Sequence, residues 1–177
     1  MLLSLLLLLA TPRTLPAAQC TKLLTAARAM VGADIEYEPA YVKIPYPNGD
    51  VAANSGVCAD VVVRSFRAVG IDLQRLVHED MERHFRAYPA KWGLKAPDAN
   101  IDHRRVPNLM KFFERRGKSL PLDGDFRACD VVAWDLGGGV THIGVVTGKG
   151  TVVHHIGGHP AEEDVLHAWT IIGHFAE

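Results

Sequence analysis

The sequence predicts an α+β fold, in which N-terminal helices pack on a C-terminal antiparallel sheet. Up to Gly117, apolar residues recur at intervals of three and four, the spacing of amphipathic helices. From Cys129 onwards the pattern changes to short β-branched or aromatic runs separated by glycine-rich junctions. Because Gly148-Lys149-Gly150 is short enough for a tight hairpin, the strands are expected to form an antiparallel meander.

Four helices are predicted, and each ends before a glycine or a proline, the residues that stop helices most strongly. They cover residues 19–31, 58–69, 72–88 and 107–116. Strands are predicted over residues 41–44, 130–134, 140–147, 151–155 and 170–175. The remaining expectations are a tight turn at 47–50, an irregular loop over 89–102 and a turn of helix around 164–169.

The composition is that of an ordinary globular protein. The 177 residues are 48% hydrophobic and 22% charged, and residues 19–177 are expected to form one domain. A net charge of −1 leaves no basic excess to neutralise phosphates, so nucleic acid is not expected as a partner. The protein is expected to be a monomer.

Residues 1–18 have the pattern of a secretory signal peptide. The apolar run from Leu2 to Ala10 is too short to span a bilayer, and small residues follow it, so the mature chain is expected to begin near Gln19 without a transmembrane span. The protein is therefore expected to be exported, to the periplasm or the cell exterior. Lipidation of Cys20 is not expected, because Gln19 stands where lipoprotein signals usually carry Gly or Ala.

The three cysteines leave at least one thiol unpaired in an oxidising compartment. Cys58 is the candidate for the free thiol. A Cys20–Cys129 bridge is compatible with the sequence but does not follow from it.

Cys58 is the candidate nucleophile because it lies at the start of an amphipathic helix. It shares one stripe with Val62, Phe66 and Val69. The unpaired N–H groups and the positive dipole end of a first helical turn favour a thiolate and can bind an oxyanion. The alternative is that Cys58 is simply a small buried residue of the core.

The neighbours of Cys58 complete this predicted helix start. Ser55 or Asn54 can serve as N-cap, and Asp60 and Arg64 are spaced for an i,i+4 ion pair. In the first turn, Ala59 and Asp60 are candidates for the oxyanion hole and the substrate pocket.

A histidine pair is predicted from two adjacent strands. Alternation places His142 and Gly144 on one face of their strand, where the glycine leaves room beside the imidazole. If the hairpin aligns the strands, His154 can hydrogen-bond the far ring nitrogen of His142 and set its tautomer.

Two alternatives compete with a Cys58–His142–His154 triad. His142 can be a core histidine whose hydrogen bonds are satisfied. The second alternative is a zinc site formed by the four histidines 142, 154, 155 and 159. The chain has no Cys-x-x-Cys pair to support such a site. No metal or other cofactor is therefore expected.

Other polar residues are candidates for substrate binding. Arg104 or Arg105 can bind a carboxylate, or can merely close a surface ion-pair network with their acidic neighbour. His155 is a further pocket candidate.

Several stretches resemble one bacterial family, domain of unknown function 1287, over residues 27–174. The matching stretches are residues 46–51, 56–61, 70–74, 76–81, 100–109 and 142–146, which read YPNGDV, GVCADV, GIDLQ, LVHEDM, NIDHRRVPNL and HIGVV.

More distantly, the order of elements resembles the papain-like cysteine hydrolases of bacterial cell walls, the NlpC-type endopeptidases and CHAP amidases. Those enzymes have a cysteine at a helix start, a Gly-Asp-led strand, a His-Val-Gly-Ile-like strand and a strand with a third polar residue. The resemblance implies a papain-like arrangement, with Cys58 as nucleophile, His142 as base and His154 as its orienting partner. The chain departs from the NlpC pattern in having Val57-Cys58-Ala59-Asp60 for Asp-Cys-Ser-Gly, and Cys129 for the glycine of Gly-Asp.

The expected function is therefore an exported cysteine hydrolase that cleaves an amide bond, in the peptide part of the cell wall or in another amide substrate. The alternatives are a catalytically silent module that binds a wall peptide on the same fold, and a transferase that uses the same acyl-enzyme.

Overall fold

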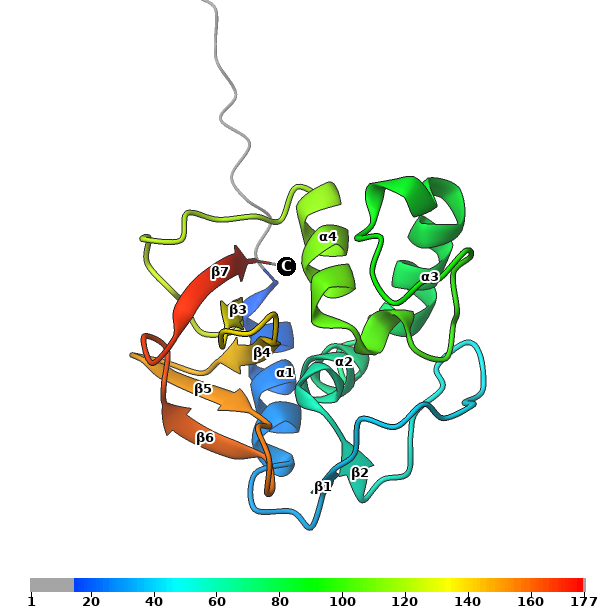
Figure 1. Cartoon of the computed structure of the whole chain (residues 1–177). Coiled ribbons are helices and arrows are strands. Elements are labelled where there is room, and N and C mark those ends of the chain that lie inside the picture. The colour runs from blue at the N-terminus through cyan, green and yellow to red at the C-terminus, as the bar shows by residue number, and fades with distance from the viewer. Residues whose placement is uncertain (1–14, 177) are drawn as a thin grey trace, which may run out of the picture.

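The computed structural model describes residues 15–176, and in it helices precede a five-stranded sheet (Figure 1). The helices are α1 (Ala17–Ala29), α2 (Cys58–Arg67), α3 (Leu73–His84) and α4 (Val106–Arg115), with short 3-10 turns η1 (Phe85–Ala87) and η2 (Asp102–Arg104). The strands of the sheet are β3 (Val131–Asp135), β4 (Thr141–Val146), β5 (Thr151–His154), β6 (Ala161–Asp164) and β7 (Thr170–Phe175). A separate parallel pair is formed by β1 (Glu36–Tyr37) and β2 (Ser55–Gly56).

The sheet has the strand order β6-β5-β4-β3-β7, and every neighbouring pair is antiparallel. In Figure 1 the sheet lies on the left and α3 on the right, while α4 and, below it, α2 lie in the middle. The predicted α+β fold is confirmed, and its central strand β4 packs against the helix that begins at Cys58.

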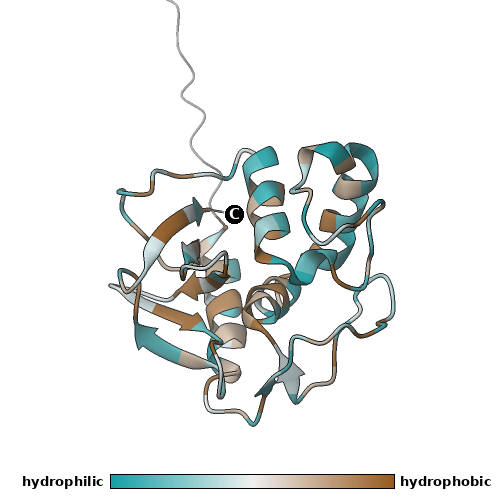
Figure 2. Cartoon of the chain, in the orientation of Figure 1, coloured by the Kyte–Doolittle hydropathy of each residue, from teal (hydrophilic) through white to brown (hydrophobic). Residues whose placement is uncertain are grey.

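The two faces of the sheet belong to two apolar clusters because strand side chains alternate. On the helix side, Ile143 and Val145 of β4 pack with Phe66 of α2. On the other side, Trp134 of β3 packs with Leu166. Figure 2 shows the apolar residues gathered on α2 and the inner strands, and hydrophilic residues along α3. Full burial of a side chain such as Phe66 stabilises the fold by about 1.5–3 kcal/mol.

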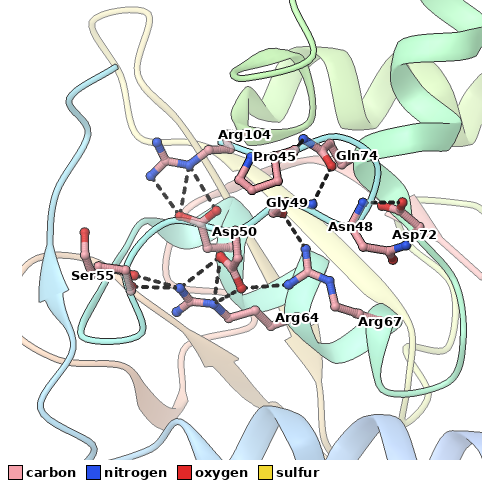
Figure 3. Close-up of polar contacts among 12 residues, drawn as sticks. Pro45, Asn48, Gly49, Asp50, Ser55, Arg64, Arg67, Asp72, Gln74 and Arg104 are labelled. Atoms are coloured by element: carbon pink, nitrogen blue, oxygen red, sulfur yellow. Dashed lines mark hydrogen bonds and ion pairs between the residues drawn. The ribbon is translucent and has the colours of Figure 1, made fainter. Parts of the chain in front are cut away.

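The loop over residues 45–50 is fastened to α2 and α3 by side chains. Asp50 accepts hydrogen bonds from Arg64 (Nε–Oδ2, 3.0 Å) and Arg67 (Nη1–Oδ2, 2.7 Å), and Figure 3 shows its carboxylate between the two guanidinium groups. The buried side chain of Gln74 accepts from the N–H of Gly49 and donates to the carbonyl of Pro45. These contacts hold the segment that leads into the cysteine helix.

Two predicted elements are wrong, and in both cases contacts with residues distant in the sequence determine the local structure. Residues 41–44 are not a strand, because their polar groups bond to the loop at 98–100: Tyr41 donates to Asp98 and the N–H of Ile44 donates to Asn100. The turn of helix predicted around 164–169 is not formed: residues 161–164 are β6, which pairs with the edge of β5, and residues 165–169 are a non-helical connection.

The predicted signal peptide, residues 1–18, lies almost entirely outside the described residues. Among residues 15–176, no helix is both long and apolar enough to cross a membrane. The described chain contains a disulfide between Cys20 and Cys129, which ties α1 to the start of β3, and Cys58 is its free cysteine.

Candidate active site

Cys58 is the first residue of α2, and the helix start is built differently from the prediction. Ser55 and Asn54 do not cap the helix: Ser55 belongs to β2, and the N-cap is Val57 in an extended conformation. The carboxylate of Asp60 instead turns back and accepts from the N–H of Val57 at 2.7 Å. An acidic residue in the first turn thus satisfies the backbone ahead of the helix and complements the helix dipole.

The thiol of Cys58 is buried, with 5% of the residue exposed. Burial raises the pKa of Cys58 to about 11, although hydrogen bonds from the backbone N–H groups of Ile143, Ala59 and Cys58 itself act in the opposite direction. The helix start thus favours the thiolate as expected, but the loss of water outweighs it. With this pKa the thiol is protonated at neutral pH, and its sulfur accepts from the backbone N–H of Ile143, the residue that follows His142 in β4.

Tyr37 is a neighbour of the thiol that sequence reasoning missed. Burial, together with the charge and hydrogen bond of Cys58, raises its pKa to about 12. The pairing of β1 with β2 brings Tyr37 opposite Gly56, two residues before Cys58. A strand of two residues leaves no readable period, so nothing in the sequence indicates this approach.

The predicted histidine pair is present. Nε2 of His142, on β4, lies 2.9 Å from Nδ1 of His154, on β5, and both residues are buried. Gly144 is needed between them, because a Cβ there would lie 2.6 Å from a methyl carbon of Val152 and 3.1 Å from Cβ of His154. The glycine beside His142 therefore does leave the room that the pattern indicated.

Glu163, on β6, extends this pair into a chain of three groups. Its Oε2 lies 2.9 Å from Nε2 of His154. A carboxylate only accepts, so Nε2 of His154 carries the proton and Nδ1 of His154 accepts from Nε2–H of His142. The remaining nitrogen, Nδ1 of His142, then holds a free lone pair, which is the form a general base requires. Sequence reasoning missed Glu163 because it placed no strand at 161–164.

The imidazole of His142 is neutral over the physiological range. Burial, with smaller contributions from the neighbouring His154 and His155, lowers its pKa to about 3. Trp134 stacks on the ring at a centroid distance of 5.4 Å. Within residues 15–176 no hydrogen bond joins the Cys58 sulfur to this ring, and Nδ1 has no partner. The site at rest thus contains a neutral thiol and a neutral imidazole.

Arg104 and Asp60 form a buried ion pair. Nη2 of Arg104 donates to Oδ2 of Asp60 at 2.9 Å, and Nε donates to Oδ1 at 3.0 Å. Arg104 also donates to the carbonyls of Glu38 and Ala40, just after Tyr37. The predicted Asp60–Arg64 pair is wrong, since Arg64 binds Asp50. The Asp60–Arg104 pair is buried, whereas one of the two predictions for Arg104 placed it in a surface network. The pair joins the start of the cysteine helix to the segment that carries Tyr37.

A groove of about 420 Å³ opens beside Cys58. Among the residues that line it are Tyr37, Tyr41, Trp92, Arg105 and Thr141. Cys58 is therefore reachable from this groove. Two other predicted residues, Arg104 and Arg105, also line it, whereas His142 and His154 do not.

The other two histidines of the zinc alternative do not join the pair. His155 is buried, donates from Nε2 to the carbonyl of Gly158 and packs edge-on against Tyr37 at 5.0 Å. His159 lies 3.2 Å from the carbonyl of Ile35. Over residues 15–176 no three His, Cys, Asp or Glu side chains are grouped so that they could hold a metal ion.

Comparison with known proteins agrees with this architecture. Residues 24–176 match the family model described as domain of unknown function (DUF1287). The chain is 49% identical over 158 residues to the uncharacterized protein YijF of Escherichia coli (strain K12), an alignment that covers 84% of this chain and 77% of that protein.

Among solved structures, the fold is similar to a Staphylococcus aureus protein described as similar to lipoprotein, of the NLP/P60 family. The superposition has a TM-score of 0.52 at 11% identity and covers 94% of this chain but only 44% of the other, so this chain spans less than half of that protein. This likeness concerns the fold. Because the family model and the Escherichia coli relative both cover most of the sequence, the chain belongs to the DUF1287 family.

Proposed function

We propose that this protein is an exported cysteine hydrolase that cleaves an amide bond in cell-wall peptides. The observation that carries the proposal is the chain Glu163–His154–His142, which leaves Nδ1 of His142 as a hydrogen-bond acceptor on the strand against which the Cys58 sulfur packs. A nucleophile, a base and a group that orients the base are the three parts of acyl-transfer sites.

In the proposed mechanism, Nδ1 of His142 takes the proton of the Cys58 thiol as the sulfur attacks the amide carbonyl. Catalytic hydrogen bonds often tighten only in the complex with substrate, so this contact is expected to form there. The oxyanion is stabilised by N–H groups at the start of α2, those of Cys58 and Ala59, with the hydroxyl of Tyr37 nearby. The His142 imidazolium then protonates the leaving amine.

Water completes the cycle by hydrolysing the thioester, with His142 as general base again. No step requires a cofactor. His154 and Glu163 keep the proton on Nε2 of His142 and stabilise the imidazolium when it forms.

Two features support export and a cell-wall substrate. The Cys20–Cys129 disulfide is typical of a protein that folds in an oxidising compartment, in agreement with the signal-like residues 1–18. The fold is similar to that of a protein described as belonging to the NLP/P60 family. The substrate is accordingly proposed to be a peptide of the peptidoglycan.

The direct test is digestion of purified peptidoglycan by the wild type and by Cys58→Ala, with the soluble fragments identified by mass spectrometry. The proposal expects release by the wild type alone, and the fragment masses would then identify the bond. Equal release by both proteins, or no release by either although both are folded, would contradict it.

A catalytically silent peptide-binding module is the second candidate. The observation that favours it is the raised pKa of Cys58, because a protonated thiol is a weak nucleophile. In that case the digestion gives no product, while the wild type still binds to peptidoglycan in a sedimentation assay.

The pKa of Cys58 predicts how the thiol reacts with iodoacetamide. Since only the thiolate reacts and the pKa is about 11, the rate of alkylation should rise about tenfold per pH unit between pH 7 and pH 10. Mass spectrometry after timed quenching measures it, and the other two cysteines are protected as a disulfide. A rate that is already high and flat at pH 6 would mean that the resting site is a thiolate–imidazolium pair.

Glu163→Gln tests the role of the carboxylate in setting the tautomers. The glutamine amide can donate to Nε2 of His154, which reverses both histidine tautomers and puts a proton on Nδ1 of His142. We expect kcat/KM to fall by about tenfold or more, because the protonated Nδ1 cannot act as a base. The matched control is Glu162→Gln on the same strand, whose carboxylate pairs with Arg28 and should leave kcat/KM unchanged. Equal effects of the two substitutions would exclude this role.

A further inference from the structure

The groove beside Cys58 contains a cation that lacks an acidic partner. Arg104 is neutralised by Asp60, but the next residue, Arg105, lines the groove, and its side chain donates no hydrogen bond to any residue within 15–176. Its Nη1 is buried and has no hydrogen-bond partner within residues 15–176. Leaving a buried donor unpaired costs about 1–3 kcal/mol, and more for a charged group, so an acceptor that enters the groove would be bound favourably.

The guanidinium of Arg105 is held in a fixed orientation. Its central carbon lies 4.1 Å from the centroid of the Trp92 ring, a cation–π contact. A planar guanidinium presents parallel N–H groups that match the two oxygens of a carboxylate. The stacked arrangement thus pre-orients Arg105 for a planar anion.

The nearest carboxylates of the protein do not use this cation. Asp98 accepts from the hydroxyl of Tyr41, and Asp102 accepts from the N–H of Asp98. Burial lowers the pKa of Arg105, and the charges of Asp102 and Asp98 offset only part of this lowering; neither carboxylate lies within ion-pair distance of the guanidinium. The charge of Arg105 therefore remains available to a ligand.

The rim of the groove is aromatic and accessible. Trp92 is 49% exposed and Tyr41 is 53% exposed, values that are high for large side chains with apolar rings. Exposed aromatic groups next to a single oriented charge are typical of sites that bind a ligand with an apolar body and a polar group.

We propose that this groove binds an acidic residue of the substrate peptide, whose carboxylate is received by Arg105 and whose chain is thereby positioned at Cys58. This inference rests on the proposed function, since it names the substrate feature that the same site recognises. The ligand class is a peptide with a free carboxylate close to the scissile amide.

The test measures binding without turnover, in the full chain carrying Cys58→Ala. The ligands are peptide fragments of purified peptidoglycan, used as isolated and after their carboxylates have been converted to methylamides. By calorimetry we expect the native fragments to bind about tenfold or more tightly than the amidated ones, which corresponds to one charge-assisted bidentate contact. Adding Arg105→Gln should abolish this preference.

The controls separate charge from geometry. Arg116→Gln removes another arginine stacked on a ring, that of Phe112, away from the groove, and should keep the preference. Arg105→Lys retains the charge but not the planar fork, and should keep part of it. Circular dichroism establishes that each variant is folded.

Equal binding of native and amidated fragments, no binding of either, or a preference that survives in Arg105→Gln would overturn the inference. Because the assay does not depend on hydrolysis, its result is separate from that of the digestion experiment. A protein that digests peptidoglycan without this preference would retain the proposed function and lose the carboxylate site.

Discussion

Replacing His142 by glutamine is expected to lower kcat/KM for amide hydrolysis by about 10³-fold while the protein remains folded. A positioned general base contributes about 10²–10⁴-fold to such reactions, and the hydrogen bonds of His154 and Glu163 leave Nδ1 of His142 as the acceptor for this role. Glutamine retains a donor toward Nδ1 of His154, so that the buried histidine does not lose its partner. The measurement is the initial rate of fragment release from peptidoglycan.

The matched control is His159→Gln. This histidine has a side chain that is 54% exposed and is not part of the hydrogen-bond chain, so its removal should leave the rate unchanged. Thermal unfolding of both variants separates lost chemistry from lost structure. If His142→Gln kept more than a tenth of the wild-type rate, the base would have to be a different group.

The second large effect is expected on stability, from Asp60→Leu. The substitution leaves the buried guanidinium of Arg104 without its carboxylate and the N–H of Val57 without its acceptor. Breaking one side of a buried ion pair costs about 3–5 kcal/mol, a large part of the free energy of unfolding of a typical domain. Urea unfolding followed by circular dichroism measures this loss.

The double variant Asp60→Leu, Arg104→Met tests the cause. Removing both charges avoids the unpaired cation, so it should recover most of the stability that Asp60→Leu loses. Its activity should remain low, because Asp60 also holds the backbone ahead of Cys58 and Arg104 holds the segment after Tyr37. Asp50→Asn serves as a comparison, because the Asp50–Arg64 pair is more exposed. It should lower the free energy of unfolding by less than Asp60→Leu does. If both acidic positions had equal effects, the burial of the Asp60–Arg104 pair would not be what stabilises the helix start.

The fold class could be predicted because hydrophobic periodicity is local. The four helices and the strands that bear Val131, His142 and Val153 were all readable as runs of period 3.6 or 2. The residues of β6, Ala-Glu-Glu-Asp, have no such period and little strand propensity. They form a strand because the edge of β5 offers unpaired backbone groups.

The candidate site likewise has features that local sequence patterns predict and features that depend on the tertiary structure. Spacing by itself determined that a cysteine begins an amphipathic helix, and alternation indicated that His142 and His154 could meet if the hairpin aligned their strands; the register that brings them together came from the structure. Only the tertiary structure decided that Glu163 sets the histidine tautomers, that Asp60 pairs with Arg104 and not Arg64, and that Arg105 remains unpaired in the groove. The physical reason is that hydrogen bonds and ion pairs act over about 3 Å in space, and which distant side chains come that close is set by packing of the whole chain.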